Sequence, residues 1–144
     1  MKTVSQEKLL ERQIQKHADH VLRAMEVLQY KVYDAELASE IARQIGEMAN
    51  IYNEAALKLI ESGTTRYHRS RFLRFLFAME LAIKTMFNMS TGNIALLLIK
   101  KMQDVAVDTE KVFRNVSVKD GTAKLARELL VMTEEQVKSL KEFL

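Results

Sequence analysis

The chain has 144 residues, 48% of them hydrophobic and 28% charged, which is the composition of an ordinary globular protein large enough to bury one core. It has no cysteine, which excludes disulfide bonds and thiol chemistry, and no proline and only four glycines, which disfavours strands and tight hairpins. The net charge of +3 is uneven, because an acidic stretch, residues 34–62, precedes a basic one, residues 63–89.

The first predicted helix covers about residues 4–32. Thr3 and Gln6 have the spacing of a capping box at its start. The apolar stripe that follows has steps of three and four residues and consists of Leu10, Ile14, His17, Val21, Met25, Leu28 and Val32. We expect a break near Asp34, which would cap the next helix. One continuous helix over residues 4–61, forming a long coiled coil, is the alternative.

The second predicted helix covers residues 35–61 and has the most regular pattern in the chain. Its apolar seam has heptad spacing and consists of Ala38, Ile41, Ile45, Met48, Tyr52, Ala55 and Leu59. A ladder of glutamates, seven residues apart, follows another flank and consists of Glu40, Glu47, Glu54 and Glu61. The sequence Ser-Gly-Thr-Thr at residues 62–65 then predicts a helix end and a new start.

Residues 66–89 form the most apolar predicted helix. From residue 72 onward, only a thin polar line interrupts its apolar side chains, and this line consists of Arg74, Glu80, Lys84 and Asn88. A helix that is apolar on nearly all sides has to be surrounded by other helices. We therefore expect this helix at the centre of the fold.

Two further helices complete the chain. Ser90 or Thr91 is the expected N-cap of a helix over residues 93–116. Residues 119–122 then predict a break, and the last helix carries Ala126, Leu130, Val137, Leu140 and Leu144 on one face. A second capping-box spacing, which begins at Thr133, predicts a bend or a restart within this helix.

Helices of similar length with short connections favour antiparallel neighbours. The sequence thus predicts an all-α fold, an antiparallel bundle of four to five long helices with the 66–89 helix central, in a single domain over residues 1–144. Neither a leader sequence nor an apolar run long enough to span a bilayer is apparent, so we expect a cytoplasmic protein without a membrane span. No cofactor is predicted.

A basic cluster opens the third predicted helix, where the helix dipole disfavours cations. The candidate contacts for an anion are Arg66, Tyr67, His68, Arg69, Arg71 and Arg74, together with Lys100 and Lys101 on the next helix. The first interpretation is internal, because the glutamate ladder would neutralise the cluster if the second and third helices form a hairpin. The second is an external anion, such as nucleic-acid phosphate, with Tyr67 and His68 stacking on bases.

The first helix also carries two weaker signals. Residues 12–17, with the sequence Arg-Gln-Ile-Gln-Lys-His, resemble the Arg-x4-His signature of the HEPN ribonucleases, a family of all-α dimeric proteins. The resemblance covers six residues and implies that Arg12 and His17 are catalytic. His17 and His20 are also three residues apart, as in some metal sites. The simpler interpretation is a partly buried histidine in an apolar stripe and a solvated arginine, and we predict no metal site.

The apolar residues are more numerous than a single bundle requires, because the second, third and fourth helices each carry more than one apolar row. The methionines and phenylalanines of the third helix are interpreted mainly as core residues and alternatively as an adaptable surface for a partner helix. No phosphate loop, nucleophile elbow or pair of catalytic carboxylates is recognisable. We therefore expect a non-enzymatic interaction protein, an adaptor or assembly subunit that binds a protein partner or itself. A nucleic-acid-binding subunit is the alternative, and a HEPN-like ribonuclease is a remote one.

Overall fold

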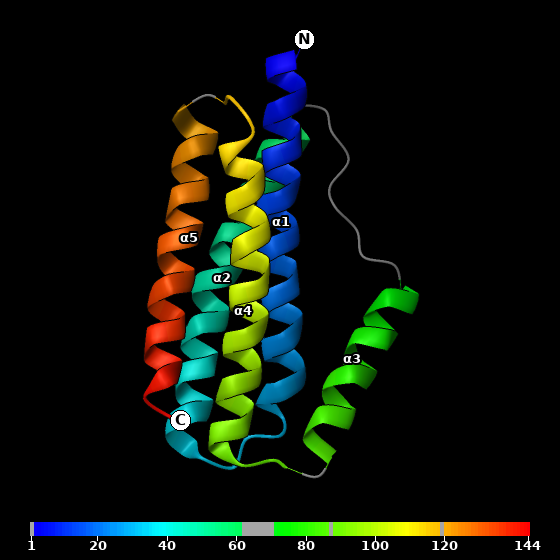
Figure 1. Cartoon of the computed structure of the whole chain (residues 1–144), viewed down its shortest axis with the longest axis vertical. Coiled ribbons are helices and arrows are strands. Elements are labelled where there is room, and N and C mark those ends of the chain that lie inside the picture. Colours follow the sequence, from blue (N-terminus) through cyan, green and yellow to red (C-terminus); the bar gives the residue numbers. More distant parts are fainter. Residues whose placement is uncertain (1, 62–70, 87, 119) are drawn as a thin grey trace.

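The structure, a computed structural model, describes residues 2–61, 71–86, 88–118 and 120–144. For residues 2–5, 71–73 and 86 it describes the backbone alone. The helices are α1 (Lys2–Gln29), α2 (Ala35–Glu61), α3 (Arg71–Met86), α4 (Thr91–Arg114) and α5 (Asp120–Lys141). The described residues contain no strand. Four of the helices, α1, α2, α4 and α5, stand side by side as a bundle, and α3 lies at its edge (Figure 1). The predicted all-α bundle is confirmed.

Short polar side chains define two of the helix starts. The backbone N–H of Leu37 donates to Oδ1 of Asp34 at 2.8 Å, which satisfies a group that the first turn of α2 leaves unpaired. At the start of α4, the N–H of Asn93 donates to Oγ of Ser90 at 3.3 Å. The breaks predicted at these positions are confirmed, and the alternative of one continuous helix over residues 4–61 is wrong.

The last helix differs from the prediction at two points. Because α5 begins at Asp120, Gly121 and Thr122 belong to its first turn rather than to a break. The helix also continues through Thr133 without a bend or restart. The Thr133 hydroxyl donates to the backbone oxygen of Leu129 at 2.8 Å, so it bonds to the preceding turn instead of capping a new one.

The core lies among the four bundle helices, and α1 contacts each of the other four helices. The stripe predicted for α1 is buried over its whole length from Leu10 to Leu28. Large side chains with no exposed surface come from the other helices as well and include Ile41, Met48, Leu59, Ile94, Leu98, Met102 and Leu140. Burying a side chain of this size contributes about 1.5–3 kcal/mol.

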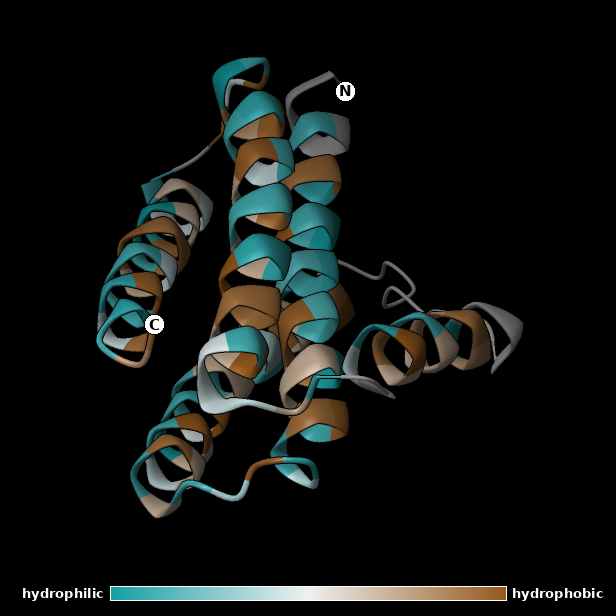
Figure 2. Ribbon diagram, turned by 60° about the horizontal axis from the view of Figure 1, so that its bottom comes forward, coloured by the Kyte–Doolittle hydropathy of each residue, from teal (hydrophilic) through white to brown (hydrophobic). Residues whose placement is uncertain are grey.

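The central position predicted for the third helix is wrong. Of its described apolar side chains, Phe77 and Leu81 are buried, but Phe75 and Ile83 are well exposed. Figure 2 shows hydrophobic residues along α3, although this helix lies beside the bundle and not within it. The reason is that α1, α2, α4 and α5 already enclose a core among themselves, so among the described helices only one face of α3 packs against a neighbour. Among the described helices, none combines the length and the apolar content needed to cross a bilayer.

Candidate interaction surface

The inner face of α3 attaches this helix to α1 and α4. Phe77 is 7% exposed and packs against the ring of His20, with 4.8 Å between the ring centroids and an interplanar angle of 57°. The ammonium of Lys101 lies 5.2 Å from the centroid of the same phenyl ring, a cation–π contact. One turn further along, Leu81 has no exposed surface. Phe77 is therefore held between a side chain of α1 and a side chain of α4.

Glu80 ties α3 to α4 by charge. Its Oε1 accepts hydrogen bonds from Nζ of Lys84 at 2.8 Å and from Nζ of Lys101 at 3.0 Å. The hydrogen bond from Lys84, which has the largest effect, and the hydrogen bond from Lys101 hold the pKa of the Glu80 carboxyl below its ordinary value. The positive charge of Lys101, one of the predicted anion contacts, is thus already balanced by a carboxylate of the protein itself.

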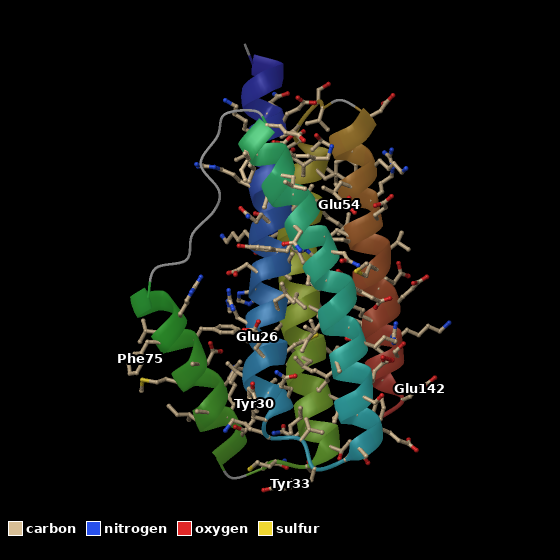
Figure 3. The ribbon with its side chains drawn as sticks, turned by 180° about the vertical axis from the view of Figure 1, so that it is seen from behind. Glu26, Tyr30, Tyr33, Glu54, Phe75 and Glu142 are labelled. Atoms are coloured by element: carbon tan, nitrogen blue, oxygen red, sulfur yellow. The ribbon has the colours of Figure 1, made fainter. Side chains whose placement is uncertain are left out.

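The outer face of α3 is an apolar stripe against which no other described helix packs. Phe75, Leu76, Met79 and Ile83, here named the α3 outer face, are between 42% and 60% exposed. They form one stripe because Phe75, Met79 and Ile83 follow at four-residue steps and Leu76 lies seven residues before Ile83. Phe75 is on the side of α3 that faces away from the bundle (Figure 3). Contiguous exposed apolar residues of this kind mark interaction sites on soluble proteins.

The structure describes the side chains of three of the eight predicted anion contacts. Arg74 is exposed near the start of α3, three residues before Phe77 and therefore on the inner side of the helix rather than on the α3 outer face. Lys100 is exposed on α4, and Lys101 is turned towards α3. Four other predicted contacts, Arg66, Tyr67, His68 and Arg69, lie outside the described residues, as does the side chain of Arg71. The basic cluster therefore stays a prediction for most of its members.

The glutamate ladder of α2 does not lie along the described part of α3. Glu47 pairs with Arg43 at 3.0 Å, and Glu54 lines a groove between α2 and α5. The described residues of α3 pack against α1 instead. Internal neutralisation by an α2–α3 hairpin is therefore not found for Arg74.

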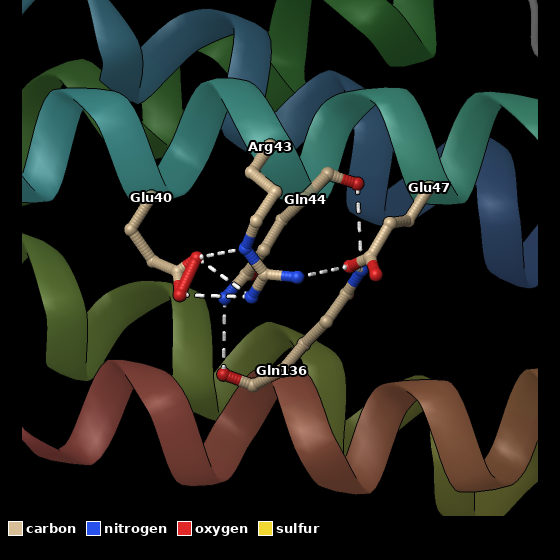
Figure 4. Close-up of polar contacts among 5 residues, drawn as sticks. All are labelled: Glu40, Arg43, Gln44, Glu47 and Gln136. Carbon is tan, nitrogen blue, oxygen red and sulfur yellow. Dashed lines mark hydrogen bonds and ion pairs between the residues drawn. The ribbon is translucent and has the colours of Figure 1, made fainter.

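Polar side chains also join α2 to α5 inside the bundle (Figure 4). Nε2 of Gln44 donates to the backbone oxygen of Gln136 at 3.2 Å, and Nε2 of Gln136 donates to the backbone oxygen of Gln44 at 3.3 Å. At the edge of this pair, Arg43 bridges Glu40 at 2.7 Å and Glu47 at 3.0 Å. The reciprocal amide contacts fix the axial register of the two helices, which is a structural role.

His17 lies in a buried hydrogen-bond chain that joins α1, α4 and α5. Its Nδ1 is 2.8 Å from Oγ1 of Thr109, and its Nε2 is 3.0 Å from Oγ1 of Thr133. Because the Thr133 hydroxyl gives its hydrogen to Leu129, it accepts from His17. The geometry thus assigns the hydrogen to Nε2, and Nδ1 accepts from Thr109. Burial lowers the pKa of His17 from 6.5 to about 3, so the ring is neutral at physiological pH.

This arrangement gives His17 a structural role. A general base must come within hydrogen-bond reach of its substrate, but both ring nitrogens of His17 are engaged and the residue has no exposed surface. Arg12, the other residue of the HEPN-like pattern, is exposed five positions earlier, on a different side of α1. Within the described part of the chain, no three residues of the types that bind metals are grouped to hold an ion.

The fold and the surface together define a class, a four-helix bundle to which a fifth helix is attached with its outer face left apolar and exposed. No protein-family model, curated protein or solved structure matches this chain. Its function is therefore inferred from its own residues.

Proposed function

We propose that this chain is a non-enzymatic interaction protein, an adaptor or assembly subunit that associates with itself through the α3 outer face. The observation that supports this proposal is that one side of α3 is packed while four large apolar side chains stay exposed on the other. Removing apolar surface from water contributes about 25 cal/mol per Å², so covering this stripe favours association. Most oligomers of soluble proteins are homo-oligomers, so a second copy of this chain is the first partner to test.

Sedimentation velocity over a range of protein concentrations tests the proposal. The parent protein is expected to self-associate, and the double variant Phe75→Gln/Ile83→Gln is expected to be monomeric. The matched control is Leu57→Gln/Ile60→Gln on α2, because Leu57 and Ile60 are 57% and 56% exposed and lie outside α3. Glutamine has a good helix propensity, so neither pair of changes should lower the melting temperature measured at a concentration at which the parent is monomeric. A parent protein that stays monomeric throughout, or a control that dissociates equally, contradicts the proposal.

Nucleic-acid binding is a second candidate function, supported by the exposure of Arg74 and Lys100. Neither side chain forms an ion pair with a carboxylate of the described residues, and the stretch over residues 63–89 carries five basic groups and one acidic group. Clustered cations on one segment are the electrostatic footprint of phosphate binding.

Mobility shifts of mixed RNA and DNA oligonucleotides across a salt series test this second candidate. Binding is expected to fall steeply with salt, and Arg69→Gln/Arg71→Gln should weaken it and reduce the salt slope by about one for each lost phosphate contact. Arg114→Gln/Arg127→Gln, on α4 and α5, removes the same charge elsewhere and should leave binding intact. No shift at low salt, or equal effects of the two pairs, excludes a nucleic-acid site at residues 63–89.

A further inference from the structure

Met79 is the most exposed methionine among the side chains that the structure describes. It is 42% exposed, and Met89 and Met132 are only partly exposed. Three methionines of the bundle have no exposed surface, namely Met25, Met48 and Met102. The thioether of methionine is open to oxidation, and exposure decides which side chains of a folded protein an oxidant reaches first. Met79 is therefore the described methionine most accessible to an oxidant.

Met79 also lies in the middle of the α3 outer face. Phe75 is one turn before it and Ile83 one turn after it, so the three side chains project from the same side of the helix. Both neighbours are more than half exposed. The next residue, Glu80, is turned towards α4, where its carboxylate accepts from Lys101 at 3.0 Å. Along the stripe, the sulfur of Met79 is thus flanked by apolar side chains.

Oxidation of Met79 by a peroxide converts its thioether into a sulfoxide. The sulfur attacks an oxygen of the peroxide, so that a sulfur–oxygen bond forms while the oxygen–oxygen bond breaks. With hydrogen peroxide, the leaving hydroxide takes the proton from the transferred oxygen and departs as water. The sulfur is thereby oxidised and the peroxide is reduced. A flexible apolar side chain becomes a polar one, whose new oxygen accepts hydrogen bonds.

The sulfoxide has different consequences in a single copy and in an assembly. In a single copy its oxygen stays hydrated on the exposed side of α3, and the packing of Phe77 on the inner side is unchanged. When the α3 outer face is covered, the oxygen loses its water, and the side chains of Phe75, Leu76 and Ile83 have no hydrogen-bond donor to offer. Covering an unpaired polar group is expected to weaken association by about tenfold to a hundredfold.

We infer that Met79 is an oxidation site through which peroxides dissociate the assembly of this chain. The inference rests on the self-association proposed above and adds its regulation by an oxidant. The peroxide reacts with the single copy, because covering the α3 outer face shields the sulfur. Since an oxidised copy associates weakly, the equilibrium shifts towards single copies as the reaction proceeds. Reduction of the sulfoxide back to the thioether reverses the change.

Treatment with hydrogen peroxide in large excess, followed by peptide mapping in a mass spectrometer and by sedimentation velocity, tests the inference. Met79 is expected to gain an oxygen atom before the three buried methionines, and at a rate that falls as the protein concentration rises and the copies associate. The oxidised protein should associate about tenfold or more weakly than the untreated parent, with the same melting temperature at a concentration at which both are monomeric.

Two variants show which methionine is responsible. Met79→Leu keeps an apolar side chain of similar volume and should associate to the same extent before and after treatment. Met86→Leu is the matched control, because it removes another methionine of α3 and leaves Met79 in place. This control should lose association on treatment as the parent does.

The outcomes distinguish the inference from the function on which it rests. An untreated parent that is monomeric at every concentration overturns both. If the parent associates, but does so equally well once Met79 has been converted to the sulfoxide, only the inference is wrong. The same holds if the Met79→Leu protein loses association on treatment, or if Met86→Leu prevents the loss. Methionine sulfoxide reductase should restore association to the oxidised parent, and dissociation that persists after complete reduction also contradicts the inference.

Discussion

Acidification towards pH 3 is expected to remove about 5 kcal/mol of folding free energy through His17 alone. The pKa of this residue is lowered from 6.5 to about 3 in the folded protein. Between these two values the unfolded chain binds the proton more readily than the folded one. The contribution to stability is therefore complete above pH 6.5 and is lost progressively as the pH falls towards 3. Since small domains are stable by only about 5–15 kcal/mol, acid unfolding should follow.

The cause is the buried chain of hydrogen bonds around the ring. Protonation would place a hydrogen on Nδ1, which now accepts from Thr109 at 2.8 Å. The Thr109 oxygen already accepts a bond from Nε2 of Gln13 at 3.2 Å, so the hydroxyl would have to turn away and its bonding would be rearranged. Burial of the cation is the larger cost, and the charge of His20 nearby adds to it.

Urea unfolding of the parent and of His17→Gln between pH 7 and pH 4 measures this effect. The variant should be less stable at pH 7 but should lack the acid-dependent loss, which reaches about 3 kcal/mol by pH 4.5 in the parent. Carboxylates such as Glu80, whose pKa Lys84 and Lys101 lower, titrate in both proteins and cancel in the comparison. Parallel pH profiles for the two proteins, or an NMR titration in which His17 is charged at pH 6, would contradict the assignment.

Local signals predicted the starts of α2 and α4 well, but Thr3, which was expected to cap the first helix, lies inside α1, because α1 already includes Lys2. Asp34 and Ser90 cap the helices that they were expected to cap, because a short side chain next to unpaired backbone N–H groups acts within one turn. The start of α5 was predicted too late because Gly121 was interpreted as a break, although a glycine is tolerated in a first turn that ends on well-packed residues.

The sequence contains less information about which helices pack against one another. Hydropathy identifies α3 as apolar on most sides, but it does not say whether its neighbours come from the same chain or from another one. Phe77 is buried while Phe75, two residues earlier, is exposed, because of how α3 lies against α1. The spacing of apolar residues in the sequence does not indicate this position. His17 occupies a predicted apolar stripe, so a polar residue in that stripe was the available signal for the buried layer that it forms with Thr109. Their pairing with Thr133 required knowledge of which helices adjoin.

The replacement Phe77→Ala is expected to release α3 from the bundle while the other four helices stay folded. Truncation of a buried phenylalanine costs about 3–5 kcal/mol. The described inner face of α3 has only two other fully buried side chains, Leu81 and Thr85, and the Thr85 hydroxyl bonds within its own helix to the Leu81 oxygen at 2.8 Å. The loss therefore falls on an element with few other contacts. Amide hydrogen exchange should show α3 losing protection by about a hundredfold or more, with α1 and α4 unchanged.

At a concentration at which the protein is monomeric, Phe75→Ala is the matched control, because it changes the same residue type two positions earlier on the exposed face and should leave the protection of α3 as it is. A cooperative loss of protection in all five helices of the Phe77→Ala protein would show instead that α3 is integral to the fold.

The Phe77→Ala variant also tests how α3 takes part in association. The α3 outer face can dock with little ordering cost only while Phe77 holds the helix in place, since a preformed surface binds more tightly than one that must first be ordered. Phe77→Ala should therefore weaken self-association although Phe77 itself is not part of the docking surface.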